Sequence, residues 1–299
     1  MKSAFSLFFL ITVLVSQAQI TEKKLASGKL ISIKNFESKF VLPRNIDIWL
    51  PEGYDQDSNT KYSVLYMQDG QNLFDPALSY GGIEWQVDET LTRLMNKDSI
   101  RKVIVVGIWN SPKRFLEYDP YKAFEKLPSK IKTQLEKEYN GRPLSDQYLQ
   151  FMVSELKPYI DDHFRTKNDR NNTFVAGSSM GGLISMYALF EYPNIFSGAA
   201  CISTHWPVSI RNNGPEAPKA LLHYMLSHFP KQQCRIYFDH GTETLDSRYA
   251  PYQSIIDIGL IQHAPKTLEW LSKIYEGAAH NEASWRERFG TIAIWLLKK

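Results

Sequence analysis

Residues 173–181 read Thr-Phe-Val-Ala-Gly177-Ser178-Ser179-Met180-Gly181, a short apolar strand pattern that leads into a GxSxG turn. A helical pattern over 180–191 follows at once. In such a strand–turn–helix, small flanking residues allow a bend tight enough to expose the central serine. The N-terminus of the helix would favour a negative charge that develops beside this serine. The pattern therefore predicts Ser179 as a nucleophile, with an incidental serine in a glycine-rich turn as the alternative.

Strand and helix patterns alternate through the rest of the chain. The segments 30–34 and 45–50 alternate apolar and polar residues, as half-buried antiparallel strands do. The runs 62–67 and 102–107 are continuously apolar, as parallel strands covered on both faces should be. The repeated units predict an α/β fold, a mostly parallel central sheet of about eight strands with helices on both faces. The other expected strands are the one before Ser179, 198–203, 235–239 and 268–275, and the expected helices are 85–95, 147–164, 180–191, 219–229, 249–260 and 282–297.

Length and composition are those of a single domain. A chain of 299 residues with 43% hydrophobic content can bury one large core, and we expect one domain over 19–299. The polar, lysine-rich segment 115–143 interrupts the alternation as a helical insert, either a solvated surface excursion or a substrate lid. The net charge of +3 is small, and no basic cluster alternates with aromatic residues. The expected partner is a small-molecule or glycan-linked substrate rather than a nucleic acid.

The first 18 residues have the pattern of a cleavable secretory signal peptide. Lys2 precedes an apolar run over 4–15, and Ser16-Gln17-Ala18 supplies small residues where a signal peptidase cuts. The run is shorter than the ~20 apolar residues that a bilayer-spanning helix needs, so a membrane anchor is the lesser alternative. We expect an exported protein, periplasmic or secreted, without stable membrane insertion after cleavage.

Export permits disulfides, but the two cysteines are badly placed for one. Cys201 lies near the end of its expected strand, whereas Cys234 begins the next. In adjacent parallel strands they would be separated by roughly four residues at ~3.3 Å each, which exceeds disulfide reach. We expect two buried thiols.

His280 is the candidate base. A serine nucleophile needs a base, and the base needs an orienting acid. His280 follows the expected strand 268–275 through the small-residue loop Glu276-Gly-Ala-Ala279 and precedes the last helix. Of the seven histidines, it alone lies just beyond the last strand.

The loop after the preceding strand offers three acids, in Asp239-His-Gly-Thr-Glu243-Thr-Leu-Asp246. Asp239 is expected to end the strand, whereas Glu243 and Asp246 lie where a side chain can reach a neighbouring histidine. We favour Asp246, with Glu243 as the alternative acid and a helix cap as the alternative role of Asp246. Nucleophile, acid and histidine in this order follow the chain order of an α/β-hydrolase and exclude those of chymotrypsin and subtilisin.

The loop after 62–67 is the candidate second half of the site, and it reads Gln68-Asp-Gly70-Gln71-Asn-Leu-Phe-Asp75. Gly70 would allow a backbone turn that aims the Gln71 N–H inward. With the N–H of Met180 it would form an oxyanion hole. A simple Asp-Gly turn is the alternative.

Five stretches together resemble a known family: MQDGQNLFD, GSSMGGL, STHWP, HGTETLD and GAAHNEASWRERF. They are similar to the "putative esterase" family of α/β-hydrolases, which includes enterochelin-type siderophore esterases, feruloyl esterases and S-formylglutathione hydrolases. The resemblance covers residues 44–299. It implies the α/β-hydrolase fold and a serine hydrolase with the triad Ser179, Asp246 and His280. It also implies oxyanion donors at Gln71 and Met180.

Two further residues, together with Gly70, are candidates for substrate binding. Arg114, in Arg114-Phe-Leu-Glu117-Tyr118, resembles a family segment close to the catalytic pocket and could bind an anionic or polyhydroxy substrate. The alternative is a surface ion pair with Glu117. Trp206 could form the floor of an acyl or aromatic pocket, with ordinary core packing as the alternative.

The leading hypothesis is an exported serine carboxylic ester hydrolase that works through an acyl-enzyme on Ser179. Siderophore lactones and feruloyl or acetyl esters of polysaccharides are the substrates considered. No metal or cofactor is expected, because the sequence has no HExxH, EF-hand, CxxC or phosphate-cradling glycine loop. The alternatives are an acyltransferase with the same triad and a non-catalytic binding protein on the hydrolase fold. The acyl and alcohol groups and the oligomeric state stay open.

Overall fold

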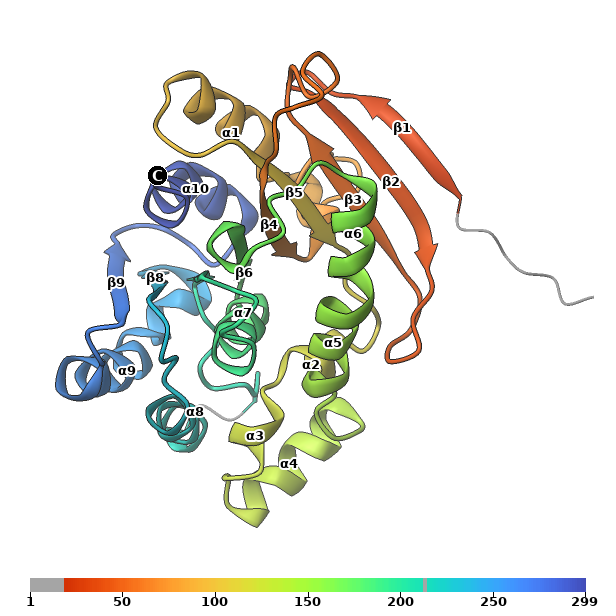
Figure 1. Cartoon of the computed structure of the whole chain (residues 1–299). Coiled ribbons are helices and arrows are strands. Elements are labelled where there is room, and N and C mark those ends of the chain that lie inside the picture. Colours follow the sequence, from red (N-terminus) through yellow and green to blue (C-terminus); the bar gives the residue numbers. More distant parts are fainter. Residues whose placement is uncertain (1–18, 212–213) are drawn as a thin grey trace, which may run out of the picture.

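The computed structural model describes residues 19–211 and 214–299. The expected signal peptide over 1–18 lies outside the described residues. The centre of the molecule is a nine-stranded sheet (Figure 1). Its strands are β1 (Ile20–Lys24), β2 (Lys29–Phe36), β3 (Arg44–Leu50), β4 (Ser63–Gln68), β5 (Val103–Ile108), β6 (Thr173–Ser178), β7 (Gly198–Ile202), β8 (Cys234–Gly241) and β9 (Leu268–Tyr275).

The strands lie in the order β1-β2-β3-β5-β4-β6-β7-β8-β9. The pairs from β1 to β5 are antiparallel, and every pair from β5 through β4 to β9 is parallel. The predicted mostly parallel sheet with an antiparallel opening is therefore confirmed. The ninth strand, β1, was not expected. All five of its residues are exposed, so no hydrophobic alternation marks it, and it exists by pairing with β2.

Helices cover both faces of the sheet, as predicted (Figure 1). One face packs against α1 and α10 through a buried cluster that includes Leu65, Leu91 and Phe289. The other face packs against α5, α7, α8 and α9. The helices are α1 (Val87–Asn96), α2 (Arg114–Tyr118), α3 (Tyr121–Phe124), α4 (Ser129–Tyr139), α5 (Ser145–Phe151), α6 (Lys157–His163), α7 (Met180–Glu191), α8 (Glu216–Ser227), α9 (Ala250–His263) and α10 (Glu282–Leu296).

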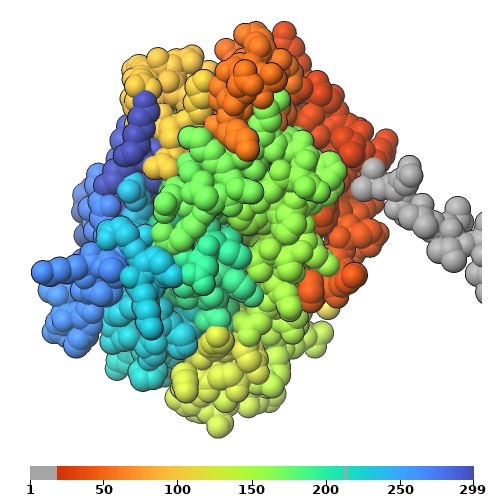
Figure 2. Space-filling view, viewed as in Figure 1, coloured from red at the N-terminus to blue at the C-terminus, as the bar shows by residue number. Residues whose placement is uncertain are grey.

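A π-helical turn, Met152–Leu156, joins α5 to α6, so the single helix expected over 147–164 is one continuous rod of three segments. The insert over 115–143 contains most of α2, all of α3 and all of α4. It forms the yellow-green surface at the bottom of Figure 2. Within the insert, the rings of Phe115 and Tyr139 stack with their centroids 4.7 Å apart.

Both cysteines are free and buried, as expected. Cys201 lies in register with Phe238 of the neighbouring strand and not with Cys234. Within the part of the chain that the structure describes, no helix is both long and apolar enough to cross a bilayer.

The parallel strands bring the predicted site residues to one edge of the sheet. The loops that follow β4, β6, β8 and β9 carry Gln71, Ser179, Asp246 and His280 respectively. The carboxyl ends of parallel strands lie at the same edge, and this is where ligands bind in open α/β sheets.

Candidate active site

Ser179 stands at the sharp turn between β6 and α7. Its backbone adopts φ 58° and ψ −122°, a conformation that residues with a Cβ rarely take. The N–H of Ser179 donates to the Ile202 carbonyl at 2.8 Å, which ties the turn to the neighbouring strand β7. Gly177 is required here, because a Cβ would lie 2.6 Å from the Gly181 carbonyl oxygen. The strained turn places the Ser179 side chain at the N-terminus of α7.

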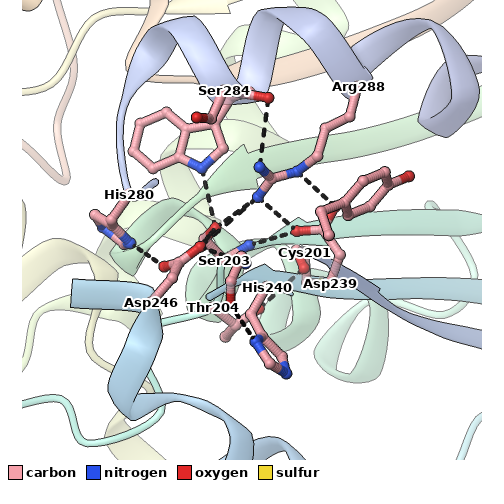
Figure 3. Close-up of polar contacts among 12 residues, drawn as sticks. Cys201, Ser203, Thr204, Asp239, His240, Asp246, His280, Ser284 and Arg288 are labelled. Carbon is pink, nitrogen blue, oxygen red and sulfur yellow. Dashed lines mark hydrogen bonds and ion pairs between the residues drawn. The ribbon is translucent and has the colours of Figure 1, made fainter. Parts of the chain in front are cut away.

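His280 and Asp246 are in direct contact (Figure 3). Nδ1 of His280 lies 2.6 Å from Oδ1 of Asp246, which sits in a 3-10 turn, Thr244–Arg248. The N–H of His280 donates to the Thr244 hydroxyl at 2.8 Å, which joins the two loops. Glu243, the alternative acid, is exposed. The structure thus brings Asp246, not Glu243, to the imidazole.

Hydrogen bonds hold Asp246 in its ionised form. Its Oδ2 accepts from the Ser203 hydroxyl at 2.5 Å and from the Gly241 N–H at 2.6 Å. Burial raises the pKa of the Asp246 carboxyl, but the contact with His280 and these two bonds lower it by more, so its pKa is below the usual value. An ionised carboxylate can only accept. Nδ1 of a neutral His280 must therefore carry the hydrogen, which leaves the Nε2 lone pair as a base.

Two residues that the sequence analysis did not single out complete the surroundings of Ser179. The Tyr249 hydroxyl lies 2.5 Å from Nδ1 of His205, and it also hydrogen bonds with the Ser179 side chain. The Tyr249 ring packs edge-on against His280, with centroids 5.5 Å apart. The N–H of His205 donates to the Ser179 carbonyl at 3.1 Å. Tyr249 therefore contacts the expected nucleophile and the expected base together.

His205 is held in its neutral form. Burial, and after it the charge of His280, lower the pKa of His205 to about 3. Its Nε2 is buried and has no hydrogen-bond partner among the described residues. The stretch STHWP contains this histidine, but its partner Tyr249 lies directly before α9. Sequence spacing alone gives no signal that the two side chains meet.

The loop after β4 carries Gln71, whose N–H is one of the two expected oxyanion donors. Asp69 adopts a left-handed conformation with φ 57°, and a single 3-10 turn, Gly70–Asn72, follows. Within the described residues, neither the Gln71 N–H nor the Met180 N–H donates a hydrogen bond to the protein. Met180 follows Ser179 directly in the chain, and Gln71 lies in the loop after β4, the strand that pairs with β6. An oxyanion hole requires two N–H donors beside the nucleophile that have no other hydrogen-bond partner.

The reason for glycine at position 70 differs from the expected one. The tight turn falls on Asp69 and not on Gly70. Gly70 instead lets the loop approach strand β5, because a Cβ there would lie 2.4 Å from the Gly107 carbonyl carbon. Gly70 is buried, so its place in the site is to support the loop rather than to form a contact surface for substrate.

Arg114 has a different partner from the one expected. It forms two bonds of 2.7 Å with Asp69, from Nε to Oδ1 and from Nη2 to Oδ2. Burial lowers the pKa of Arg114, but the Asp69 carboxylate raises it by more. The alternative role of Arg114, an ion pair with Glu117, is wrong, because the Glu117 carboxylate binds the buried guanidinium of Arg44 at 2.7 Å. Arg114 therefore lies beside the loop after β4 as a cation whose charge Asp69 neutralises.

Trp206 belongs to the core and does not line an open pocket. Its side chain is fully buried. The indole N–H donates to the Gln253 side chain at 2.8 Å, and the ring packs on Phe238 at 5.5 Å between centroids. The expected role as a pocket floor is therefore replaced by the alternative, core packing.

The insert forms hydrogen bonds with the loop that carries His205. The Tyr139 hydroxyl donates to the Val208 carbonyl at 2.7 Å. Glu138 accepts from the Ser209 hydroxyl at 2.6 Å and from the Ile210 N–H at 2.9 Å. These contacts join α4 to the edge of the site, so the insert is more than a free surface excursion.

No cluster of three or more His, Cys, Asp or Glu side chains suited to a metal ion occurs in residues 19–211 or 214–299. The site chemistry that the described residues offer is that of a serine, an imidazole, a carboxylate and main-chain N–H donors.

A family model described as "Putative esterase" matches residues 40–296. YbbA of Bacillus subtilis is 25% identical over 164 residues, which cover 54% of this chain and 58% of YbbA. YjcH of the same organism is 28% identical over 149 residues, or 50% of each chain. A xylanase/feruloyl esterase of Xylanibacter ruminicola is 25% identical over 58% of this chain, but the match covers only 21% of that enzyme. The matches thus span 58% and 50% of the two Bacillus subtilis relatives and about a fifth of the third.

Solved structures show the same fold. An IroE-like serine hydrolase from Shewanella oneidensis has a TM-score of 0.63 and 24% identity, covering 93% of this chain and 78% of that one. A ferulic acid esterase has a TM-score of 0.63 and 16% identity, covering 92% and 98%. The enterobactin esterase of Shigella flexneri has a TM-score of 0.62 and 17% identity, covering 94% and 59%. The architecture is therefore that of these α/β hydrolases, as the sequence predicts.

Proposed function

Because the chain belongs to the esterase family, we propose that it is a carboxylic ester hydrolase that acts through an acyl-enzyme on Ser179. The observation that carries the proposal is the 2.6 Å contact between His280 Nδ1 and Asp246 Oδ1, at the sheet edge where Ser179 stands on a strained turn. A serine, an oriented imidazole and a buried carboxylate together form the standard device for acyl transfer.

In the first half of the reaction, Nε2 of His280 takes the proton of the Ser179 hydroxyl as Oγ attacks the ester carbonyl carbon. Asp246 keeps the hydrogen of His280 on Nδ1 and stabilises the imidazolium that forms. The imidazolium then gives its proton to the departing alcohol oxygen, and Ser179 keeps the acyl group. In the second half a water molecule gives its proton to Nε2, attacks the acyl carbon, and the proton returns to Oγ.

The N–H groups of Gln71 and Met180 receive the negative charge that develops on the carbonyl oxygen. They come from two different loops and have no other partner in the described chain, so no hydrogen bond must break before the oxyanion binds. Removal of one such donor from an enzyme of this kind costs on the order of 10²–10³ in kcat. The dipole of α7 adds to the effect at Met180.

We propose that the enzyme is exported and that its substrates are siderophore lactones or feruloyl and acetyl esters of polysaccharides. The names of the enterobactin and feruloyl esterases among the similar proteins support this range. Arg114 is the proposed polar contact for the substrate. Since Asp69 already neutralises its charge, we propose that the Asp69–Arg114 pair offers hydrogen bonds to hydroxyl groups rather than a net positive charge to an anion.

A substrate panel tests the activity. It contains p-nitrophenyl acetate, methyl ferulate, an acetylated xylo-oligosaccharide and a catecholate trilactone, each with and without an added sugar acceptor. We expect release of free acid in equal amount to the alcohol, with no acyl-sugar product, and loss of the activity in His280→Gln. A preparation that binds these esters without cleaving any of them would overturn the proposal, and acyl-sugar in place of free acid would identify an acyltransferase.

A further inference from the structure

A buried arrangement of charged and hydroxyl side chains lies behind the triad acid (Figure 3). Asp239 comes from β8, Arg288 from α10 and Ser203 from the position directly after β7. Ser203 and Asp239 are fully buried, and Arg288 is 3% exposed. None of them takes part in the reaction steps given above.

One buried cation lies between two buried carboxylates. Arg288 donates to Asp239 from Nε to Oδ2 at 3.1 Å and from Nη2 to Oδ1 at 3.0 Å. The same Nη2 is 3.9 Å from Oδ2 of Asp246, beyond hydrogen-bond range. The guanidinium therefore hydrogen bonds with Asp239 and not with Asp246.

The Ser203 hydroxyl is the only bridge between Arg288 and Asp246 that the described residues provide. Its Oγ accepts from Arg288 Nη2 at 2.7 Å and from the Trp285 indole N–H at 3.0 Å, and it donates to Asp246 Oδ2 at 2.5 Å. Guanidinium and indole groups only donate, and an ionised carboxylate only accepts. The direction of the Ser203 hydrogen is thus determined, and two donors polarise the hydroxyl toward Asp246.

The hydrogen-bond partners of Asp239 suit its ionised form. Its carboxylate accepts from the Arg288 guanidinium and, at 2.9 Å, from the backbone N–H of Ser203, and a protonated carboxyl could not satisfy these donors as well. Burial raises the pKa of Asp239 above its usual value, although the charge and hydrogen bonds of Arg288 oppose that rise. The other groups around the network are Tyr237, Tyr275, His205, Tyr249 and His280.

We propose that Asp239 is a positioning residue that holds Arg288 out of direct contact with Asp246, so that the positive charge acts on the triad carboxylate only through the Ser203 hydroxyl. This inference rests on the proposed function. A direct ion pair of Arg288 with Asp246 would take up the charge that must stabilise the His280 imidazolium. Asp239 prevents that pair by binding the guanidinium from the other side.

The charge arrangement gives opposite predictions for two single variants. Asp239→Asn removes the anion, so Arg288 moves to Asp246, the His280 imidazolium loses part of its counter-charge, and the acid limb of kcat/KM shifts to lower pH by about one unit. In the same variant kcat falls about tenfold or more, because Asp246 supports the imidazolium less. Arg288→Gln leaves an extra buried anion, so the acid limb shifts to higher pH.

The double variant Asp239→Asn/Arg288→Gln separates positioning from a purely structural role. It removes both charges and keeps Ser203 on Asp246, so we expect its acid limb to return to the wild-type position and its kcat to exceed that of Asp239→Asn. The double variant also carries no unpaired buried charge. It therefore serves as the folded test protein if either single variant does not fold.

The measurements are pH profiles of kcat/KM with p-nitrophenyl acetate and the titration of His280 by proton–nitrogen NMR, which needs no turnover. Glu117→Gln is the matched control: it breaks the buried Arg44–Glu117 pair away from the triad, and we expect a less stable protein with an unchanged acid limb. A wild-type His280 titration in Asp239→Asn, or a double variant no better than Asp239→Asn, would overturn the inference. Full activity of Ser179→Ala would instead overturn the proposed function itself.

Discussion

The Tyr249 hydroxyl forms hydrogen bonds with both His205 and the Ser179 side chain, and the distance from Tyr249 Oη to His205 Nδ1 is 2.5 Å. Burial raises the pKa of Tyr249 far above its usual value, and burial lowers that of His205 to about 3. Both groups therefore stay uncharged at working pH. A phenol that cannot ionise is suited to donate a hydrogen bond to Oγ in the second half of the reaction, when Oγ leaves the acyl carbon and negative charge builds up on it.

Tyr249→Phe removes this donor and keeps the ring that packs on His280. We expect kcat to fall about tenfold, the worth of one hydrogen bond to a developing charge, with little change in KM. Steady-state kinetics on p-nitrophenyl acetate measure both constants. Tyr224→Phe is the control, because it loses a buried hydroxyl bonded to Glu191 at a distant position. Equal kinetics for the two variants would show that Tyr249 only fills space.

The choice of triad acid leads to a paired test. Asp246→Asn keeps the shape of the side chain but gives His280 an amide instead of a carboxylate. We expect kcat/KM to fall on the order of 10³–10⁴-fold, as for a triad whose acid becomes an amide. Glu243→Gln changes an exposed residue, and we expect wild-type kinetics. A greater loss in Glu243→Gln than in Asp246→Asn would contradict the geometry.

A buried acid in the first turn of α1 links stability to pH. Oδ1 of Asp88 has no hydrogen-bond partner among the described residues, and burial, followed by the neighbouring Glu89, raises the pKa of Asp88 to about 8. The unfolded chain loses this proton near pH 4, whereas the folded protein keeps it to about 8. The folded state binds more protons across that window, so the free energy of unfolding falls as pH rises through it.

Asp88→Asn removes the titration. We expect its free energy of unfolding to depend less on pH between 5 and 9 than that of the wild type, with the largest gain in stability at the alkaline end. Urea unfolding followed by circular dichroism at three pH values checks this. Asp98→Asn, at a position whose side chain is 85% exposed, is the control. The same slope in wild type and Asp88→Asn would show that Asp88 is ionised in the folded protein.

The loop that carries Gln71 depends on close packing at Gly70. A Cβ at this position would lie 2.4 Å from the Gly107 carbonyl carbon, in a strand that cannot move away easily. In Gly70→Ala we expect the loop to shift and kcat to fall about 10²-fold through loss of the Gln71 N–H from the oxyanion hole. Gly290→Ala is the control, because a Cβ there meets its nearest neighbour at 3.5 Å. Unchanged kcat in a folded Gly70→Ala would remove Gln71 from the site.

Local patterns were sufficient for the elements that a single signal defines. The GxSxG stretch predicted the turn at Ser179 and the helix after it, and β9 and α7 have the expected bounds. Periodicity could not reveal β1, because its residues are all exposed and the strand depends on the edge of β2. The predicted order of nucleophile, acid and histidine agrees with the loops in which the structure places these residues.

Contacts between distant segments were beyond a reading of one sequence. Asp246 and Glu243 lie in one loop, and only the 3-10 turn at Thr244–Arg248 decides which of them faces His280. Arg114 pairs with Asp69, 45 positions away, and not with Glu117 on its own helix. The group around Asp239 joins residues from β7, β8 and α10, which become neighbours only when the sheet and the last helix pack together.

The most direct test of the account is covalent labelling of the folded protein by a fluorophosphonate probe, followed by mass spectrometry of the modified peptide. The account predicts one modified residue, Ser179, labelled at a rate that rises as His280 loses its proton. It also predicts no label and no ester hydrolysis in Ser179→Ala. A label on another serine, or a Ser179→Ala variant that still hydrolyses p-nitrophenyl acetate at the wild-type rate, would contradict it.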